Sequence, residues 1–557
     1  MTLIDVLVGT AIAVIIFLAI FGLLRASAQI STLAAQTAAA TAIAQSQMEY
    51  VRSLPYDDVG TVGGIPAGAI AQQATTTEDG IEYGVRTFIQ YYDDPADGIG
   101  ASDVTGVTED YKRVKVTVTY YPSTGEKQLS VVSNVSPPGV ESTTGGGTLR
   151  ISVVNASGNP VSGAEVNVVN QGVSPAVDLA TFSDSSGSVI LPGAATSTDY
   201  EITVTKTGYS TAQTYDRDAT NQNPAPGHLT VVANTTTSST FAIDALATFI
   251  MRSFAPIAPG SWTDTFADAT KLAAQTNTSV SGGALVLAAN ATSGTARSVA
   301  EEPEYLSSWS SLAASTATPA GTTLVLHVAD ADGALIPDAV LPGNSAGFSS
   351  FPVSLSGVAT STYPALAILA DLSTNDASTT PSVTDWSLAY RAGPVPVSDV
   401  SFTLTGAKTI GSTGAGAPLY KTTITSQTGA EGSVSFPIEW DAYALSDVSS
   451  NVLGGCSSYS VYPGTTAEES LMLGSDTTNS LVVTAADANG NVLPGAIVTL
   501  SRAGFSETVG TNGCGKAYFG SLDAASDYAV SVTSGALSGS AASVSVSGHA
   551  TYAITAS

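Results

Sequence analysis

The chain has 557 residues, a length that favours three to five domains. Its 46 Asp and Glu residues outnumber its 18 Lys and Arg residues, and a formal net charge of −28 argues against a nucleic-acid-binding protein. Gly, Ser, Thr, Ala and Val are abundant and fall in alternating patterns. This composition predicts many short strands joined by tight turns.

The first predicted element is a helix over residues 1–56. An uncharged apolar run extends from Val6 to Leu24, which is just long enough to span a bilayer. No proline precedes Pro55, and Ala, Gln, Leu and Met dominate after Arg25. We therefore expect one continuous helix of about 50 residues, roughly 75 Å long at about 1.5 Å per residue.

Two ordinary explanations of this stretch are a secretory signal peptide and a plain membrane anchor. A signal peptide would carry basic residues before the apolar run, but no Lys or Arg precedes Val6, and the helical pattern continues past Arg25. An anchor explains the run but not Asp5, because a carboxylate at the start of a membrane-length helix is costly in lipid unless it has a partner.

The residues around Asp5 carry a family resemblance. Residues 1–8, MTLIDVLV, resemble the mature N-terminus of type IV pilins and pseudopilins, and residues 44–56, AQSQMEYVRSLPY, are similar to the end of the long helix in many bacterial pilin-like proteins. The family acid is usually Glu, so Asp5 is one methylene shorter. The family's basic leader is absent, and we therefore expect the numbering to start at the mature residue, with Met1 as the N-methylated amine.

The resemblance implies that Asp5 acts in assembly by pairing with the Met1 amine of a neighbouring subunit inside a filament core. Elementary electrostatics supports this role, because a carboxylate within an apolar bundle needs a cation. The alternative is that Asp5 only complements the helix dipole, which is worth about a few tenths of a kcal/mol. Many pilins also have a proline near position 22, but this chain has Gly22, which weakens a helix by only ~1 kcal/mol, so melting there is in doubt.

A small antiparallel head is predicted over residues 57–141. Residues 81–89 and 114–120 alternate at a period of two, as strands do. The loop between them is rich in acids, and hard oxygen ligands at this density suit a structural calcium ion, the one cofactor that the sequence indicates. The alternative is a solvated loop in which Asp and Pro form turns. The candidate ligands are Asp93, Asp94, Asp97, Asp103 and Asp110.

Two repeated modules are predicted over residues 148–246 and 479–557, the first after a Gly-rich linker at 142–147. Their motifs predict strands joined by a Gly/Asn turn and closed by a Tyr-bearing strand in a small sandwich. The modules resemble carboxypeptidase-regulatory-like and Cna-B-like β-sandwiches, which usually act as rigid spacers or adhesive units. The matching stretches are ASGNPVSGAEV at 156–166 with ANGNVLPGAIV at 488–498, and DYEITV at 199–204 with DYAVSV at 527–532.

Two further β-sandwiches are expected between these modules. One, over residues 247–393, resembles a jelly roll or lectin, and the other spans residues 397–478. Trp262, Trp309 and Trp386 are widely spaced in the former. A carbohydrate site would need such aromatic rings to be exposed beside polar groups, whereas burial in a core is the commoner environment of Trp.

Cys456 and Cys514 are the only cysteines. Export across a membrane would place them in an oxidising setting, where a pair favours a disulfide. Such a bridge would join the module at 397–478 to the last module and would be worth ~2–4 kcal/mol. Two buried free thiols are the alternative.

No catalytic motif is recognised, and we therefore expect that the chain is not an enzyme. His228, His327 and His549 are the only histidines, and none has metalloprotease or zinc-finger spacing. Nothing resembles a nucleophile elbow or a phosphate-binding loop. Residues 487–491, DANGN, imitate the start of an EF-hand, but Val498 stands where the closing Glu is required, so we expect a hairpin turn.

These features predict an α+β fold with a long N-terminal pilin helix, a small antiparallel pilin head and several Ig-like or jelly-roll β-sandwich modules. The expected function is a structural subunit of a type IV pilus-like extracellular filament, inserted in the cytoplasmic membrane before assembly. The expected partners are other copies of the chain, the inner-membrane assembly machinery with its prepilin peptidase, and a host or surface ligand. The alternatives are a minor pilin or pseudopilin adhesin of a pilus or type II secretion system, and a membrane-anchored carbohydrate-binding protein that does not polymerise.

Overall fold

The computed structural model describes residues 3–96, 109–122, 125–138, 145–474 and 477–557, and within the first helix it describes the side chains of residue 12 and of residues from 14 onward. The chain divides into two compact units. The first unit comprises Met1–Leu246 together with Thr409–Lys421, and the second comprises Ala247–Lys408 together with Thr422–Ser557.

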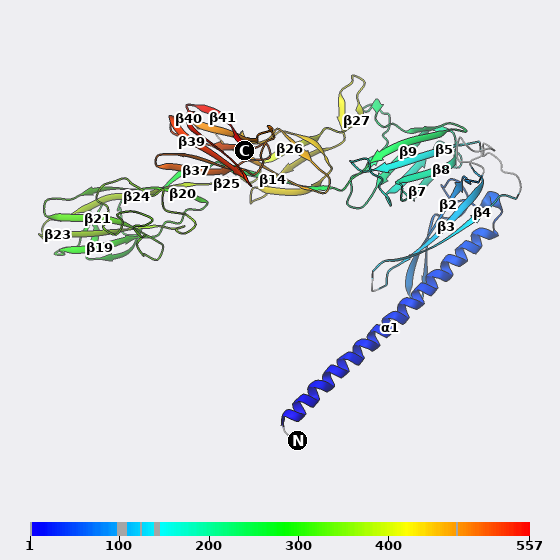
Figure 1. Cartoon of the computed structure of the whole chain (residues 1–557), viewed down its shortest axis with the longest axis horizontal. Coiled ribbons are helices and arrows are strands. Elements are labelled where there is room, and N and C mark those ends of the chain that lie inside the picture. Colours follow the sequence, from blue (N-terminus) through cyan, green and yellow to red (C-terminus); the bar gives the residue numbers. More distant parts are fainter. Residues whose placement is uncertain (1–2, 97–108, 123–124, 139–144, 475–476) are drawn as a thin grey trace. The chain divides into compact units, whose positions relative to one another are not determined.

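The first unit begins with one long helix that lies against a four-stranded antiparallel sheet (Figure 1). Every second side chain is buried from Tyr83 to Ile89 and from Lys112 to Tyr120 in the two central strands, which is the alternation expected for residues 81–89 and 114–120. Helix α1 spans Leu3–Ser53, and the 3-10 helix η1 follows at Tyr56–Asp58. The sheet, called the head sheet below, contains β1 (Gln73–Glu78), β2 (Ile81–Tyr92), β3 (Tyr111–Tyr120) and β4 (Lys127–Val135) in that order.

Three β-sandwiches follow one common plan. The first sandwich, in the first unit, contains β5 (Gly147–Val154), β6 (Glu165–Asn170), β7 (Val177–Phe182), β8 (Ser188–Ala194), β9 (Ser197–Thr205), β10 (Ala212–Gln213), β12 (Leu229–Val231) and β13 (Thr236–Ala242). The middle sandwich, in the second unit, contains β14 (Ala247–Ala255), β25 (Val395–Pro396), β26 (Ser401–Gly406), β29 (Thr423–Gln427), β30 (Ser433–Ile438), β31 (Asp441–Ser446), β32 (Val452–Gly454), β33 (Ser458–Val461) and β34 (Thr466–Leu473). The last sandwich, also in the second unit, contains β35 (Ser480–Asp487), β36 (Ile497–Arg502), β37 (Phe505–Gly510), β38 (Lys516–Phe519), β39 (Ala525–Ser534), β40 (Leu537–Val546) and β41 (His549–Ala556).

The strand pairings define this common plan. The opening strands β5, β14 and β35 pair in parallel with the closing strands β13, β34 and β41, respectively. The same opening strands pair antiparallel with β8, β30 and β38. In the facing sheet of the first sandwich, β6 lies between β7 and β9. In the middle sandwich β26 lies between β29 and β31, and in the last sandwich β36 lies between β37 and β39. The repeat therefore includes the middle sandwich, in which the sequence motif is much weaker.

A fourth sandwich is inserted into the middle one, between β14 and β25. The boundary expected at residue 247 would assign β14 to this inserted sandwich, but β14 pairs with β30 and β34. Because the parallel partner of Thr248 is Thr466, no local pattern in the sequence indicates the pairing. The inserted sandwich contains β15 (Ala258–Asp264), β16 (Leu272–Thr276), β17 (Thr278–Ser281), β18 (Ala284–Leu287), β19 (Ser293–Ser298), β20 (Leu306–Ala317), β21 (Thr322–Ala329), β22 (Val353–Ser354), β23 (Ala367–Thr374) and β24 (Ser382–Ala392). A separate small sheet in the first unit contains β11 (Asn223–Pro224), β27 (Thr409–Ser412) and β28 (Pro418–Tyr420).

The first turn of the repeat is organised by one side chain. Oδ1 of Asn155 accepts hydrogen bonds from the backbone N–H groups two and four residues later, and Oδ1 of Asp487 does the same. This self-bonded turn is the reason for the Asn/Gly motif. The EF-hand-like stretch that starts at Asp487 is therefore a hairpin turn.

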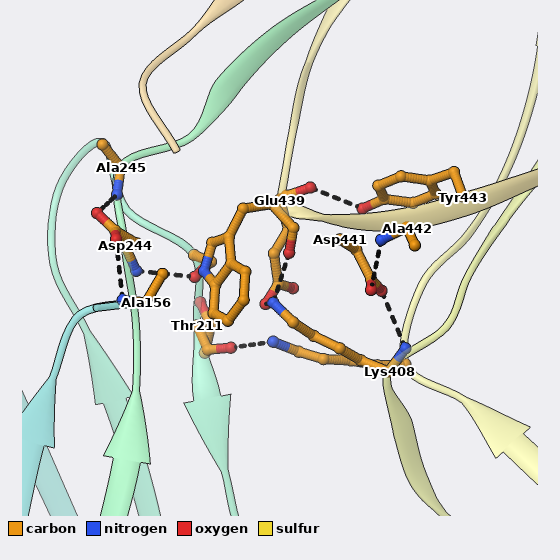
Figure 2. Close-up of polar contacts among 12 residues, drawn as sticks. Ala156, Thr211, Asp244, Ala245, Lys408, Glu439, Asp441, Ala442 and Tyr443 are labelled. Carbon is orange, nitrogen blue, oxygen red and sulfur yellow. Dashed lines mark hydrogen bonds and ion pairs between the residues drawn. The ribbon is translucent and has the colours of Figure 1, made fainter. Parts of the chain in front are cut away.

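A buried tyrosine closes each repeated sandwich. Its hydroxyl donates a hydrogen bond to a backbone carbonyl four or five residues upstream, so the polar tip is satisfied at the edge of an apolar core. In the middle sandwich the same upstream residue is also held by an ion pair, because Nζ of Lys408 lies 2.8 Å from Oε1 of Glu439 (Figure 2). The pairs are Tyr200 with Ala195 at 2.9 Å, Tyr443 with Glu439 at 2.9 Å (Figure 2) and Tyr528 with Asp523 at 3.1 Å.

The described end of the Gly-rich linker belongs to the first sandwich. Gly146 and Gly147 are buried, and Gly147 is the first residue of β5. A Cβ on Gly147 would lie 2.3 Å from the carbonyl oxygen of Val232. Glycine is therefore required here by close packing, in addition to the flexibility that composition suggests.

We expect Tyr200→Phe to lower the free energy of unfolding of the first unit by about 1 kcal/mol, because it deletes a part-buried hydrogen bond. Urea denaturation of the wild type and the variant measures the difference. The matched control is Tyr121→Phe, whose side chain is 70% exposed on the surface. Equal effects of the two substitutions would contradict the structural role of Tyr200.

Candidate functional site: the N-terminal helix and its surroundings

The C-terminal part of α1 is built into the core of the head. Ala40, Ala44, Met48 and Val51 are at most 2% exposed, and they recur every three or four residues along one face of the helix. They share a core with the inward-facing side chains of β2 and β3, such as Ile89. This stripe fixes the helix on the head sheet.

Polar contacts reinforce this packing at three positions along α1. Oγ1 of Thr37 lies 2.9 Å from the Tyr120 hydroxyl. Nε2 of Gln47 donates to Oγ1 of Thr87 at 3.2 Å. Near the end of α1, Nη2 of Arg52 donates to Oγ of Ser133 at 2.8 Å. Residues 37–52 are therefore tied to the head sheet by both apolar and polar contacts.

The preceding part of α1 is apolar but uncovered. Between residues 12 and 30 the large hydrophobic side chains that the structure describes are all more than half exposed, and they lie on every side of the helix. Between Val14 and Ser53, α1 is long and apolar enough to cross a membrane by length and composition, with a mean hydropathy of 1.9 in an 18-residue window, none of which is buried. The exposed residues, called the apolar surface of α1 below, are Ile12, Val14, Ile15, Ile16, Phe17, Leu18, Ile20, Phe21, Leu23, Leu24 and Ile30.

Of the two predicted assembly residues, the structure describes the backbone of one. Asp5 lies within the backbone of α1, and Met1 lies outside the described residues. Their pairing therefore stays a prediction. The helix continues without a break through Gly22, and a Cβ added there would meet no atom within 4 Å.

Of the five candidate calcium ligands in the acidic loop after β2, the structure describes three. The backbone N–H of Asp94 donates to Oδ2 of Asp110, and the N–H of Ala96 donates to Oδ1 of Asp94 at 3.1 Å. The bond from Ala96 is a local turn-forming bond of the alternative interpretation, whereas the bond from Asp94 joins the two ends of the loop. Asp93 is also described, whereas Asp97 and Asp103 lie outside the described residues, so calcium binding stays a prediction.

Sequence reasoning did not identify Lys112, which is only 2% exposed. Its Nζ donates to the carbonyl oxygen of Tyr56 at 2.7 Å and lies 4.4 Å from the centre of the Tyr56 ring. Burial lowers the pKa of Lys112 to about 8, and the nearby carboxylates of Asp57 and Asp58 oppose this shift. The signal was available in the sequence, because Lys112 is in phase with the inward-facing Val114 of the same strand.

The outward face of the head sheet also carries an unforeseen feature. A groove of about 850 Å³ runs over it, and its lining includes Arg86, Arg113 and Lys115. The guanidinium of Arg86 lies 4.4 Å from the ring centre of Phe182 in the first sandwich. These cations are unusual in so acidic a chain, and the strand alternation that buries their neighbours places them together on one face.

Cys456 and Cys514 form a disulfide, with Cα atoms 5.7 Å apart. It joins the middle sandwich to the last one within the second unit. Glu469 lies beside it, with Oε2 3.7 Å from Sγ of Cys456 and 3.2 Å from the backbone N–H of Gly513. Burial raises the pKa of Glu469 to about 7, and the hydrogen bond from Gly513 opposes the shift.

The tryptophans considered for sugar binding are mostly in a core. Trp309 and Trp386 are 1% and 0% exposed within the inserted sandwich, and Nε1 of Trp309 donates to the carbonyl oxygen of Tyr363 at 2.8 Å. Trp262 is half-buried against the same core. Trp309 and Trp386 therefore offer no ring surface to a carbohydrate.

Comparisons with known proteins show no family for this chain. No protein-family model matches it, and no curated protein matches it. Similar solved structures include the Bacillus anthracis TIE protein, with 10% identity, a TM-score of 0.16 and coverage of 88% of this chain and 74% of that one. They also include BcpA, the major pilin subunit of Bacillus cereus, with 10% identity, a TM-score of 0.14 and coverage of 74% and 99%. A third is the full-length major pilin RrgB of Streptococcus pneumoniae, with 12% identity, a TM-score of 0.14 and coverage of 74% and 66%.

Two of these three neighbours are pilin subunits, but TM-scores this low carry no argument about function. The function of this chain must follow from its own residues.

We expect Met48→Ala to destabilise the first unit by about 2–4 kcal/mol, because it opens a cavity between α1 and the head sheet. Chemical denaturation of the chain in detergent micelles measures the loss. Ile30→Ala is the matched control, since Ile30 is 69% exposed on the same helix and should change stability by less than about 0.5 kcal/mol. A comparable loss from both variants would contradict the division of α1 into a packed and an uncovered part.

We also expect the stability of the second unit to fall as the pH rises from about 4.5 to about 7. The pKa of Glu469 is raised from 4.5 to about 7 in the folded state, so the folded state binds more protons than the unfolded state in this window. The buried Glu507 shifts in the same direction, with its pKa also raised to about 7.

Glu469→Gln should therefore flatten part of this pH dependence in urea denaturation series at pH 5 and pH 7.5. Glu431→Gln, at an exposed residue of the same unit, is the control and should leave the dependence unchanged. An unchanged slope in the Glu469 variant would contradict the effect of burial on this carboxyl.

Proposed function

We propose that the chain is a structural subunit of a type IV pilus-like filament on the cell surface, and that it polymerises through α1. The observation that carries this proposal is the apolar surface of α1, which continues directly into a helical segment locked on the head sheet. A helix that only anchored the protein in lipid would need no such rigid continuation. A rigid continuation is useful when the position of the helix must fix the position of the head.

The energetics of the apolar surface favour association. Fully burying a large aliphatic or aromatic side chain stabilises by about 1.5–3 kcal/mol relative to water, so covering the eleven exposed side chains of this surface is worth at most roughly 16–33 kcal/mol before the cost of association. Lipid supplies this cover while the chain is a monomer in the membrane. Neighbouring copies of α1 supply it in the filament, where the hydrocarbon of the bilayer is no longer present.

Asp5 gives the proposed assembly its register. Apolar packing alone is tolerant of sliding along the helix axis, whereas an ion pair between Asp5 and the Met1 amine of a neighbour is made at one axial position only. The cost of an unpaired carboxylate in an apolar bundle penalises every other register. By this proposal, a prepilin peptidase and the inner-membrane assembly machinery recognise the residues from Met1 to Asp5.

The β-sandwiches are the displayed part of the proposed subunit. Each has an apolar core, and the core of the first sandwich also includes Ile65 from the preceding segment. The net charge of −28 keeps such a surface soluble and discourages lateral bundling of filaments. Adhesion to a host or other surface is the task that we propose for these modules.

We expect Asp5→Ala to abolish filaments while the chain still inserts in the membrane, because the substitution removes the register contact and leaves the apolar surface intact. Electron microscopy of sheared surface material and fractionation of membranes measure the two outcomes. Asp5→Glu should restore filaments, since it keeps the carboxylate. Asp57→Ala, an acid in η1 outside α1, is the control and should assemble normally.

Normal filaments from Asp5→Ala would contradict the pairing. Wild-type subunits that stay dispersed in the membrane, without filaments, would contradict polymerisation itself and favour a tethered surface protein.

A further inference from the structure

One histidine and three carboxylates converge at the edge of the first sandwich. Asp199 and Glu201 lie two residues apart on β9, so their side chains share the outer face of that strand. Tyr200, between them, is buried in the core. His228 immediately precedes β12, and Asp216 follows β10.

Backbone pairing holds these segments in place. β12 pairs antiparallel with β9 and places Leu229 opposite Tyr200, so His228 is next to Glu201 across the ladder. The backbone N–H of Tyr215 donates to the carbonyl oxygen of Pro226 at 2.9 Å, which brings the following Asp216 beside His228. The convergence is therefore a property of the fold, and it does not depend on flexible side chains alone.

The contacts of His228 differ on its two nitrogens. Nδ1 lies 2.6 Å from Oδ1 of Asp199, and Nε2 lies 3.1 Å from Oδ1 of Asp216. The ligand atoms of Glu201, Asp216 and His228 all lie within 4.8 Å of one another. The side chain of His228 is only 14% exposed, so its ring is held in this orientation while the carboxylates face solvent.

This arrangement matches the chemistry of a metal-binding histidine. A carboxylate that accepts a hydrogen bond from Nδ1–H fixes the neutral tautomer and directs the lone pair of Nε2 to the opposite side. Asp216 lies on that side, and Glu201 offers a carboxylate oxygen within 4.8 Å of the ligand atoms of both Asp216 and His228. One imidazole with two carboxylates is a ligand set for Zn²⁺ or a similar first-row divalent ion. Ca²⁺ prefers oxygen ligands throughout and fits less well.

We propose that Glu201, Asp216 and His228 bind a divalent transition-metal ion, with Zn²⁺ as the best fit. Asp199 orients His228 through its contact with Nδ1 and does not itself bind the ion. The bound ion would cross-link β9, the segment after β10 and the start of β12. The last sandwich provides a contrast at the aligned position. There Asp527 pairs with Nε of Arg502 at 3.2 Å, a permanent cation that leaves no place for a metal.

Zinc titration of the full chain in detergent micelles tests this proposal, with isothermal calorimetry as the readout and Co²⁺ absorption in the visible range as a second one. The wild type should bind one equivalent of Zn²⁺ through this site. His228→Ala should weaken binding at least 100-fold, and Asp199→Asn should weaken it about 10- to 100-fold through the loss of the orienting hydrogen bond. His549→Gln, at an exposed histidine of the last sandwich, should bind like the wild type.

Circular dichroism and thermal melting show whether each variant is folded, and Glu201→Gln replaces His228→Ala if the latter is not. Wild-type affinity in His228→Ala would overturn the proposal. So would the absence of stoichiometric Zn²⁺ binding by the wild type, which would leave simple polar contacts of His228 with the two aspartates as the explanation of the arrangement.

Discussion

The apolar surface of α1 is the constraint on which the rest of the structure depends. Nothing among the described residues covers it, yet the same helix continues into Ala40–Val51, which form part of the head core. Exposing an apolar surface of this size to water is costly, and under the proposed function lipid and then neighbouring helices cover it. Because the rod is rigidly joined to the head sheet, whatever covers it also determines where the head is placed.

The β-sandwiches meet the opposite requirement. They bury apolar side chains in their cores, repeat one strand plan three times and include a complete sandwich inserted between β14 and β25. Within the second unit the Cys456–Cys514 disulfide and the buried pair of Arg391 and Glu507, 2.5 Å apart, join neighbouring sandwiches.

Local features of this chain were predictable because their causes are local. The absence of proline before Pro55 predicts a helix that the structure shows as Leu3–Ser53. The alternation at residues 81–89 and 114–120 predicts β2 and β3, and the Asp487 turn follows from one side chain that bonds to its own backbone. The uncovered and packed parts of α1 were not separable in the sequence, because Ala, Ile and Val occur in both.

Features that join distant segments were not predictable from patterns. The partner of β14 lies beyond an entire inserted sandwich, and nothing near residue 247 indicates it. The histidines lack any metal-site spacing, but β9 and β12 bring His228 beside Glu201 through strand register. A lysine is expected on the surface, and only the strand alternation that places Lys112 on the same face as Val114 indicates that it is buried.

The most direct test of the account is a cryo-electron-microscopy map of filaments purified from cells that produce this chain. The account predicts that copies of α1 pack against one another along the filament axis, with residues 12–30 buried and the β-sandwiches on the outside. A filament in which the sandwiches make the axial contacts and α1 remains exposed at the periphery would contradict it.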